Sequence, residues 1–249
     1  MTRSTPLTVN LDQRVALVTG AGRGIGRACA LALAEAGART FAVARSQRDL
    51  DALAAENPLI EPWAVDVLSA EFIDGIEQLE RLDILVNNAG TNRPQPFVEV
   101  DADTLDTMLN LNVRANFLAA QAAARVMRRG RRGGSIIHMS SQMGHVGSPG
   151  RTVYCMTKHA VEGLTRAMAV ELAPENIRVN AVAPTFIETP LTRPMLDDPE
   201  FSSFVQSMIP LGRVGQVEDV ASAVLYLASD AATMVTGHSL RVDGGWTAA

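Results

Sequence analysis

The sequence predicts a single α/β domain in which helices cover both faces of a parallel sheet. Short apolar runs alternate with helical patterns from residue 14 to the end of the chain, which is typical of a doubly wound parallel sheet. A glycine-rich turn separates the first run from the first helix, an arrangement that brings backbone N–H groups to an anion. The 249 residues are 47% hydrophobic, which is enough for one substantial core.

Seven apolar runs are predicted as strands because they are short and rich in aliphatic and β-branched residues. In chain order they cover residues 15–19, 39–44, 60–65, 82–86, 135–139, 178–182 and 239–242. Apolar residues at helical spacing predict helices between them, over residues 25–36, 47–55, 70–79, 105–129, 154–173 and 217–229. No repeat or low-complexity block interrupts this order, so one domain is expected.

Two segments depart from the alternation. Residues 1–12 are mostly polar and lack the apolar stretch of a signal peptide, so we expect a short flexible extension before a domain over residues 13–249. Residues 185–210 contain several prolines around Phe201 and Phe204. Long insertions of this kind are usually functional, and this one predicts a mobile lid over a substrate.

Composition excludes several classes of protein. The net charge of −5 argues against nucleic acid or an anionic membrane as the main partner. No run approaches the ~18 apolar residues of a membrane span. Cys29 and Cys155 have neither metal nor disulfide spacing, so reduced thiols in a cytoplasmic protein are expected. The histidines are scattered at positions 138, 145, 159 and 238, so no metal site is expected. The arginines within residues 128–132 predict a solvated helix end.

Tyr154 and Lys158 form the most informative pair in the sequence. Four residues apart on a predicted helix, they share one face. A tyrosine titrates near ~10, and an adjacent ammonium favours its ionised form, so the pair predicts a proton-transfer site. The competing interpretation is an ordinary surface pair, because this spacing is common on helices.

The glycine turn predicts a dinucleotide site. Gly20, Gly24 and Gly26, with Arg23 and Ile25 between them, let the backbone approach a pyrophosphate at a helix N-terminus.

The end of the second strand predicts which cofactor is bound. It carries Arg45 where an NAD site places an acidic residue. Because a guanidinium pairs with a ribose 2′-phosphate, NADP(H) is favoured over NAD(H), with Arg23 as a second contact. The alternative is that Arg45 stacks on adenine or lies in solvent.

Taken together, these motifs resemble the short-chain dehydrogenase/reductase family over residues 14–246. The resemblance rests on residues 19–26, 87–90, Asn112, Ser141, Tyr154, Lys158, 178–184 and 243–245. It implies a Rossmann-type domain with a seven-stranded parallel sheet of order 3-2-1-4-5-6-7 and a cofactor at the carboxyl ends of the strands.

The resemblance also implies the catalytic roles. Tyr154 is the general acid/base, and Ser141 hydrogen-bonds the substrate oxygen. Lys158 lowers the pKa of the tyrosine and holds the nicotinamide ribose, while Asn112 anchors a water that relays protons. Ser140 is an alternative to its neighbour, but the family spacing of 13 residues before the tyrosine selects Ser141.

Further cofactor contacts follow from the same resemblance. Asp66 and Val67 are expected at the adenine, Asn88 in the cofactor cleft, and Ile187 and Thr189 at the nicotinamide carboxamide. The chain departs from the family where Thr185 replaces a common glycine after Pro184. Its hydroxyl is expected near the nicotinamide pocket.

The substrate prediction is a small polar carbonyl compound. Residues 140–145, 153–155, 184–185 and 209–212 are similar to the L-xylulose/dicarbonyl reductase branch of the family. This similarity implies NADPH-dependent reduction of ketoses and α-dicarbonyls by a homotetramer. Gln142, His145 and Arg93 are expected to contact the substrate, and Arg93 suits a sugar-acid carboxylate. For His145 the alternative is an ordinary loop residue.

Three other functions stay open from the sequence. The same residues can oxidise a polyol, aldose or sugar acid with NAD(P)+. Reduction of a 3-oxoacyl thioester is less favoured, since no basic patch is dedicated to an acidic carrier protein. A regulator that binds the cofactor without catalysis is disfavoured by the complete set of Asn112, Ser141, Tyr154 and Lys158.

Overall fold

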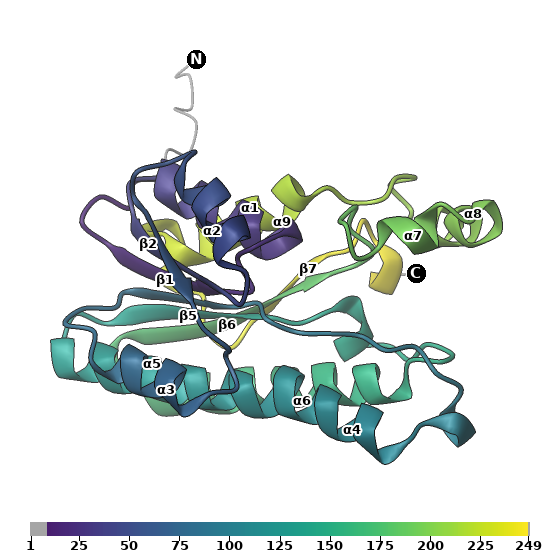
Figure 1. Ribbon diagram of the computed structural model, residues 1–249, viewed down its shortest axis with the longest axis horizontal. Coiled ribbons are helices and arrows are strands. Elements are labelled where there is room, and N and C mark those ends of the chain that lie inside the picture. The colour runs from purple at the N-terminus through teal and green to yellow at the C-terminus, as the bar shows by residue number, and fades with distance from the viewer. Residues whose placement is uncertain (1–8, 249) are drawn as a thin grey trace.

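A seven-stranded parallel sheet with helices on both faces forms the body of the protein (Figure 1). The computed structural model describes residues 9–248. The strand order β3-β2-β1-β4-β5-β6-β7 confirms the predicted Rossmann-type topology. The strands are β1 Val15–Thr19, β2 Arg39–Ala44, β3 Ile60–Ala64, β4 Ile84–Asn87, β5 Gly134–Met139, β6 Ile177–Pro184 and β7 Ser239–Val242.

The helices divide between the two faces. In Figure 1, α1, α2 and α9 cover one face, and α3, α4, α5 and α6 cover the other. Two further short helices, α7 and α8, lie beyond the end of β6. Their bounds are α1 Gly24–Glu35, α2 Gln47–Ala54, α3 Ala70–Glu77, α4 Ala102–Leu109, α5 Ala115–Gly130, α6 Thr152–Leu172, α7 Arg193–Leu196, α8 Pro199–Ser207 and α9 Val217–Ala228.

Two apolar cores hold these layers together, one on each face of the sheet. Along β1, Ala16 and Val18 belong to the core under α1 and α9, while Val15 and Leu17 belong to the core under α3 and α5. Alternate residues of a strand point to opposite faces. This explains why β1, which is buried on both faces, is almost continuously apolar in sequence.

The predicted helix over residues 105–129 is interrupted. It begins earlier, as α4, because the Asp101 carboxylate accepts a hydrogen bond from the Thr104 N–H at 2.6 Å and caps its first turn. A π-helical segment, Asn110–Arg114, then separates α4 from α5. Such bulges are frequent at functional sites, and this one carries Asn112.

The N-terminal part of the domain begins earlier than expected. Residues 1–8 of the predicted extension lie outside the described residues. Leu11, however, is only 2% exposed, and its N–H donates to the Ala36 carbonyl at 2.7 Å. The packed domain therefore includes Leu11, two residues before the expected boundary.

The segment over residues 185–210 contains two helices, α7 and α8. Phe186 packs against Phe201 and Trp246, with ring centroids 5.5 and 5.8 Å apart. This aromatic contact anchors the segment beside the C-terminal residues, and its predicted movement as a lid stays a prediction. Within residues 9–248, no helix has the length and apolar character needed to cross a membrane.

Candidate active site

The predicted site residues gather at the carboxyl edge of the sheet. The glycine turn follows β1, Asn88 follows β4, Ser141 follows β5, and Thr185 follows β6. All seven strands are parallel. Their carboxyl ends therefore meet at one edge, which is where open α/β sheets bind ligands.

Asn88 supports the glycine turn. Its amide Nδ2 donates to the carbonyls of Thr19 at 2.9 Å and Gly20 at 3.3 Å, and its own N–H donates to the Thr19 hydroxyl at 3.0 Å. Gly20 and Gly24 have φ angles of 68° and 57°, a left-handed conformation that glycine adopts without strain. The turn is therefore fixed by contacts from β4.

Substitution of Gly26 by alanine is expected to disrupt cofactor binding. A Cβ at this position would collide with the Gly20 carbonyl and the Asn88 amide, both of which define the turn. Overpacking of this kind costs about 1–3 kcal/mol, so we expect the NADPH Kd to rise about tenfold in a fluorescence titration. Gly163→Ala is the matched control, because its Cβ would meet no described atom within 4 Å. Unchanged NADPH affinity in Gly26→Ala would show that the turn does not hold the cofactor.

Lys158 is buried beside the tyrosine on α6. Its Nζ lies 5.5 Å from the centre of the Tyr154 ring and donates to the Met139 carbonyl at 2.8 Å. The side chain is almost fully buried. Burial lowers the pKa of Lys158 to about 8, and the negative charge of Glu162 opposes this change. The ammonium is therefore charged at neutral pH and loses its proton under mildly alkaline conditions.

Tyr154 has a raised pKa overall, while the lowering expected from Lys158 stays a prediction. Burial raises the pKa of the phenol, and hydrogen bonding to Ser141 and the positive charge of Arg151 only partly oppose this. The Lys158 ammonium is directed toward the Met139 carbonyl instead. The phenol is thus neutral at pH 7, the form that can donate a proton.

The structure distinguishes Ser141 from Ser140. The Ser141 side chain opposes the rise in the pKa of Tyr154, and its hydroxyl accepts a hydrogen bond from the Met143 N–H at 3.1 Å. The buried hydroxyl of Ser140 has no hydrogen-bond partner in the described part of the chain and lies beneath Gly144. Of the two serines, Ser141 is therefore the one whose side chain acts on Tyr154.

Asn112 connects the loop after β4 to α6. Its side-chain oxygen accepts from the Thr91 N–H, and its Nδ2 donates to the Thr91 carbonyl, both at 2.8 Å. Nδ2 also reaches the Thr157 hydroxyl at 3.2 Å. Asn112 is fully buried, so this amide fixes the wall of the site next to Lys158.

The sequence prediction misses two charged or titratable groups near this wall. His138 on β5 is fully buried, and burial together with the Lys158 charge lowers the pKa of His138 to about 4. Arg151 lies one helical turn before Tyr154 and is 9% exposed. The spacing of three residues between Arg151 and Tyr154 could have indicated Arg151 from the sequence. The position of His138 could not be predicted, because it depends on how the strands pack.

Two free guanidinium groups lie where the family resemblance places the adenosine end of the cofactor. The Ala21 N–H donates to the Val43 carbonyl at 3.0 Å and ties the glycine turn to the end of β2. Arg23 and Arg45 are both exposed near this junction. Neither has an ion pair or a side-chain hydrogen bond to any residue between 9 and 248. They are therefore available to a phosphate group.

Asp66 and Val67 follow β3 on the same edge. The Asp66 carboxylate accepts from the Leu68 N–H at 2.9 Å and closes the turn after the strand. Asp66 is exposed and Val67 is partly exposed. Both residues remain accessible to an adenine ring at the position the resemblance implies.

The segment after β6 reaches back over the glycine turn. Thr189 approaches to 3.5 Å of a Cβ built on Gly24, and Ile187 is buried beneath it. The Thr185 hydroxyl is buried and, within the described residues, has no hydrogen-bond partner. An unsatisfied buried hydroxyl here fits the carboxamide of a nicotinamide, since such groups are costly to leave unpaired.

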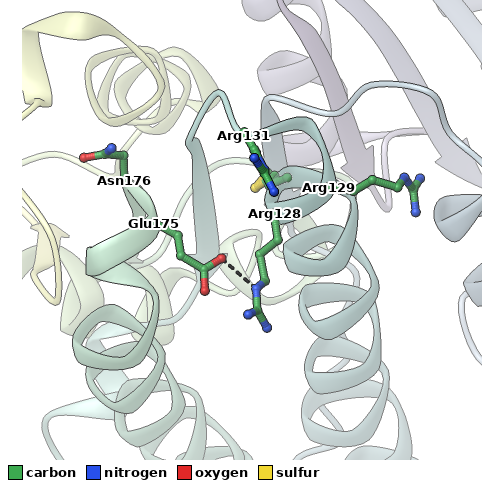
Figure 2. Close-up of a pocket in the computed structure, with 6 residues that line it drawn as sticks. Arg128, Arg129, Arg131, Glu175 and Asn176 are labelled. Atoms are coloured by element: carbon green, nitrogen blue, oxygen red, sulfur yellow. Dashed lines mark ion pairs between the residues drawn. The ribbon is translucent and has the colours of Figure 1, made fainter.

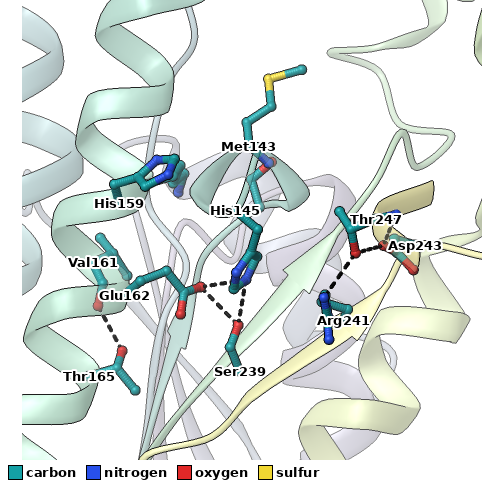
Figure 3. Close-up of polar contacts among 12 residues, drawn as sticks. Met143, His145, His159, Val161, Glu162, Thr165, Ser239, Arg241, Asp243 and Thr247 are labelled. Carbon is teal, nitrogen blue, oxygen red and sulfur yellow. Dashed lines mark hydrogen bonds and ion pairs between the residues drawn. The ribbon is translucent and has the colours of Figure 1, made fainter. Parts of the chain in front are cut away.

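The predicted substrate residues lie in different environments. Gln142 is buried, and its side-chain oxygen has no partner in the described structure. Arg93 is exposed. The His145 ring uses Nε2 to contact the Ser239 hydroxyl at 3.0 Å and the Glu162 carboxylate at 3.3 Å (Figure 3). That nitrogen of His145 is therefore occupied by a contact that joins the loop to α6 and β7.

The basic cluster at the end of α5 lies away from this site. Figure 2 shows a pocket lined by arginines near the amino end of β5, where Arg128 pairs with Glu175 at 2.7 Å. Arg129 donates to the Glu77 and Leu79 carbonyls, both at 2.9 Å. Much of the charge is thus already compensated, in keeping with a solvated helix end.

Comparison with known proteins shows which family the chain belongs to. The family model described as "Enoyl-(Acyl carrier protein) reductase" matches residues 20–247. A short-chain type dehydrogenase/reductase from Mycobacterium marinum is 39% identical, with a TM-score of 0.90 over 96% of this chain and 98% of that one. The chain belongs to the short-chain dehydrogenase/reductase family. It is an oxidoreductase that acts on CH–OH groups with NAD(P).

Two relatives in this family have names that specify a substrate. L-xylulose reductase from Mus musculus is 43% identical over 97% of this chain and 100% of its own length. A gluconate 5-dehydrogenase from Burkholderia cenocepacia, solved in complex with NADP and tartrate, is 37% identical, with a TM-score of 0.92 over 96% of this chain and 97% of that one. One relative is thus named for a neutral ketose and the other for a sugar acid.

Proposed function

We propose that this short-chain dehydrogenase/reductase is an NADP(H)-dependent enzyme that transfers hydride to or from a small polar substrate, a ketose, dicarbonyl or sugar derivative. The observation that carries the proposal is the convergence of Ser141, Tyr154 and Lys158 at the carboxyl edge of the sheet. The Ser141 side chain opposes the rise in the pKa of the phenol, and Lys158 Nζ lies 5.5 Å from the centre of the phenol ring. This is the arrangement that carbonyl reduction requires, because proton donors must meet on one oxygen.

Each residue of the site has a separate role in the reduction. The bound nicotinamide supplies the hydride. The Ser141 hydroxyl and the Tyr154 phenol donate hydrogen bonds to the substrate oxygen, and the phenol transfers its proton as negative charge develops there. The buried Lys158 ammonium stabilises the resulting phenolate. Asn112 holds the adjoining wall through Thr91. Oxidation of an alcohol uses the same groups in reverse.

Arg45 is proposed to bind the 2′-phosphate of NADP(H). A charge-assisted hydrogen bond contributes about 1.5–3 kcal/mol, so we expect Arg45→Leu to lower kcat/KM for NADPH at least about tenfold. The value for NADH is expected to change less than about threefold, since NADH lacks the phosphate. Steady-state kinetics with both cofactors test this. Arg48→Leu, at an exposed arginine on α2, is the matched control, and equal losses with both cofactors would contradict the assignment.

The relatives support this proposal in two ways. The gluconate 5-dehydrogenase was solved with NADP, and L-xylulose reductase is named for reduction of a ketose. We also expect a homotetramer in the cytoplasm. Exposed apolar residues on the outer surfaces of α5 and α6, Phe117, Met156 and Val170, support subunit contacts there.

A turnover screen at 340 nm tests the proposal. It uses NADPH or NADH with xylulose, diacetyl and keto acids, and NADP+ or NAD+ with polyols, aldoses and sugar acids. We expect rapid NADPH consumption by at least one carbonyl substrate. Preferential reduction of NAD+ by an aldose, polyol or sugar acid would instead establish a catabolic dehydrogenase and overturn the cofactor assignment.

A further inference from the structure

Arg151 places a buried positive charge beside the catalytic tyrosine. It is the residue that immediately precedes α6, and only 9% of it is exposed. Tyr154 follows three residues later in the first turn of α6, and it is near enough for the positive charge of Arg151 to oppose the rise in the pKa of the phenol. One small molecule can therefore contact both groups.

No carboxylate of the described chain neutralises this guanidinium. Between residues 9 and 248, Arg151 takes part in no ion pair, and its one side-chain hydrogen bond runs from Nη2 to the Met195 sulfur at 3.5 Å. A thioether is a weak acceptor. Burial lowers the pKa of Arg151, but a guanidinium stays protonated at neutral pH. A buried charge without a partner is costly, so the site favours an anion.

Two other arginines lie in different surroundings, although Nη1 of Arg178 is also buried without a hydrogen-bond partner in the described residues. Arg178 donates a hydrogen bond to the Ser229 carbonyl at 3.3 Å, and burial lowers the pKa of its guanidinium while the negative charge of Asp230 opposes this change. Arg93, the arginine that the sequence favours for a carboxylate, is exposed, and its charge acts on Asp101. Arg151 differs from both because it is almost fully buried, immediately precedes the helix that carries Tyr154 and has no carboxylate partner among residues 9–248.

We propose that Arg151 binds a carboxylate of the substrate, so that the enzyme acts on keto acids and the corresponding hydroxy or sugar acids. The planar guanidinium pairs with a carboxylate through two parallel hydrogen bonds. The carbonyl of the same molecule then lies at Ser141 and Tyr154. Met195, on α7, covers the guanidinium from the segment after β6. This inference rests on the proposed oxidoreductase function and narrows its substrate class.

The kinetic test compares two substrates that differ only in charge. 5-Keto-D-gluconate and L-sorbose share the same keto group and hydroxyl arrangement, with a carboxylate in the first and a CH₂OH in the second. With NADPH, wild type is expected to prefer the keto acid. Arg151→Met is expected to lower this preference, the ratio of the two kcat/KM values, about 100-fold. Arg151→Lys should restore part of it, and Arg125→Met, at an exposed residue paired with Glu77, should leave it unchanged.

Two results would overturn the assignment. Equal losses with both substrates in Arg151→Met would mean that the residue only positions Tyr154. A wild-type preference for L-sorbose would mean that the site does not select a carboxylate.

A binding measurement separates this inference from the proposed function. If wild type reduces neither ketone, calorimetric titration of tartrate into the protein saturated with NADP+ still tests the site. Tartrate binding that Arg151→Met weakens at least about tenfold supports the carboxylate site even without turnover. Equal tartrate binding in both proteins, or tighter binding of inorganic phosphate than of tartrate, would overturn it.

Discussion

Tyr154→Phe is expected to lower kcat for carbonyl reduction about 10³-fold, within the range found for loss of a general acid. The substitution removes the phenol O–H and keeps the ring. The raised pKa of Tyr154 means that the group is protonated at neutral pH, so the native enzyme begins each reduction with its proton in place. Without the hydroxyl, Ser141 alone remains to donate to the substrate oxygen.

The matched control for this variant is Tyr226→Phe. The chain contains two tyrosines, and Tyr226 lies on α9, across the sheet from the site. We expect Tyr226→Phe to keep kcat within about twofold, as is usual away from a site. The Kd of Tyr154→Phe for NADPH should rise no more than a few-fold in a fluorescence titration. Substantial turnover by Tyr154→Phe would show that another group supplies the proton.

Lys158→Met is expected to lower kcat at least about 10²-fold, because the buried ammonium stabilises the phenolate that proton transfer leaves behind. The same substitution should raise the NADPH Kd, since Lys158 is proposed to hold the nicotinamide ribose. Lys158→Arg keeps the positive charge and serves as the conservative comparison, although the planar group cannot reproduce the contact with the Met139 carbonyl.

The pH dependence of kcat is expected to follow the protonation of Lys158. The pKa of Lys158 is lowered to about 8 by burial. The charged form predominates below this value and the neutral form above it. Since the charged form stabilises the phenolate, kcat for reduction should fall as pH rises through about 8. In Lys158→Arg this decline should move to higher pH, because the guanidinium keeps its proton.

The titration of Lys158 can be observed directly. It is the only lysine in the sequence, so protein labelled with ¹³C at lysine Cε gives one side-chain signal. An NMR titration should yield a midpoint near pH 8. A midpoint near the ordinary value of about 10.4 would mean that burial does not perturb the ammonium, and the pH dependence would then need another cause.

Much of the fold could be predicted because it rests on local patterns. Strand and helix periodicity locates the seven strands, and the glycine turn identifies the first strand–helix junction. Their spatial order comes from the family resemblance, not from periodicity. The break at Asn112 could not be predicted, since the π-helical segment is fixed by contacts with Thr91 and Thr157, which lie far away in sequence.

The catalytic residues were easier to predict than their electrostatics. Tyr154 and Lys158 share a helix face by spacing alone. The direction in which their pKa values shift depends mainly on burial, which only the folded chain produces. His145 is a similar case, because its contact with Glu162 and Ser239 joins three separate elements.

The central claim is that this site couples NADPH oxidation to carbonyl reduction through Tyr154. Its most direct test measures NADPH loss at 340 nm and alcohol product by chromatography in the same reaction, for wild type and Tyr154→Phe. We predict one alcohol formed per NADPH consumed by wild type and almost none by the variant. NADPH that binds tightly to wild type but is not consumed with any ketose, dicarbonyl or keto acid would contradict the claim and indicate a cofactor-binding protein without catalysis.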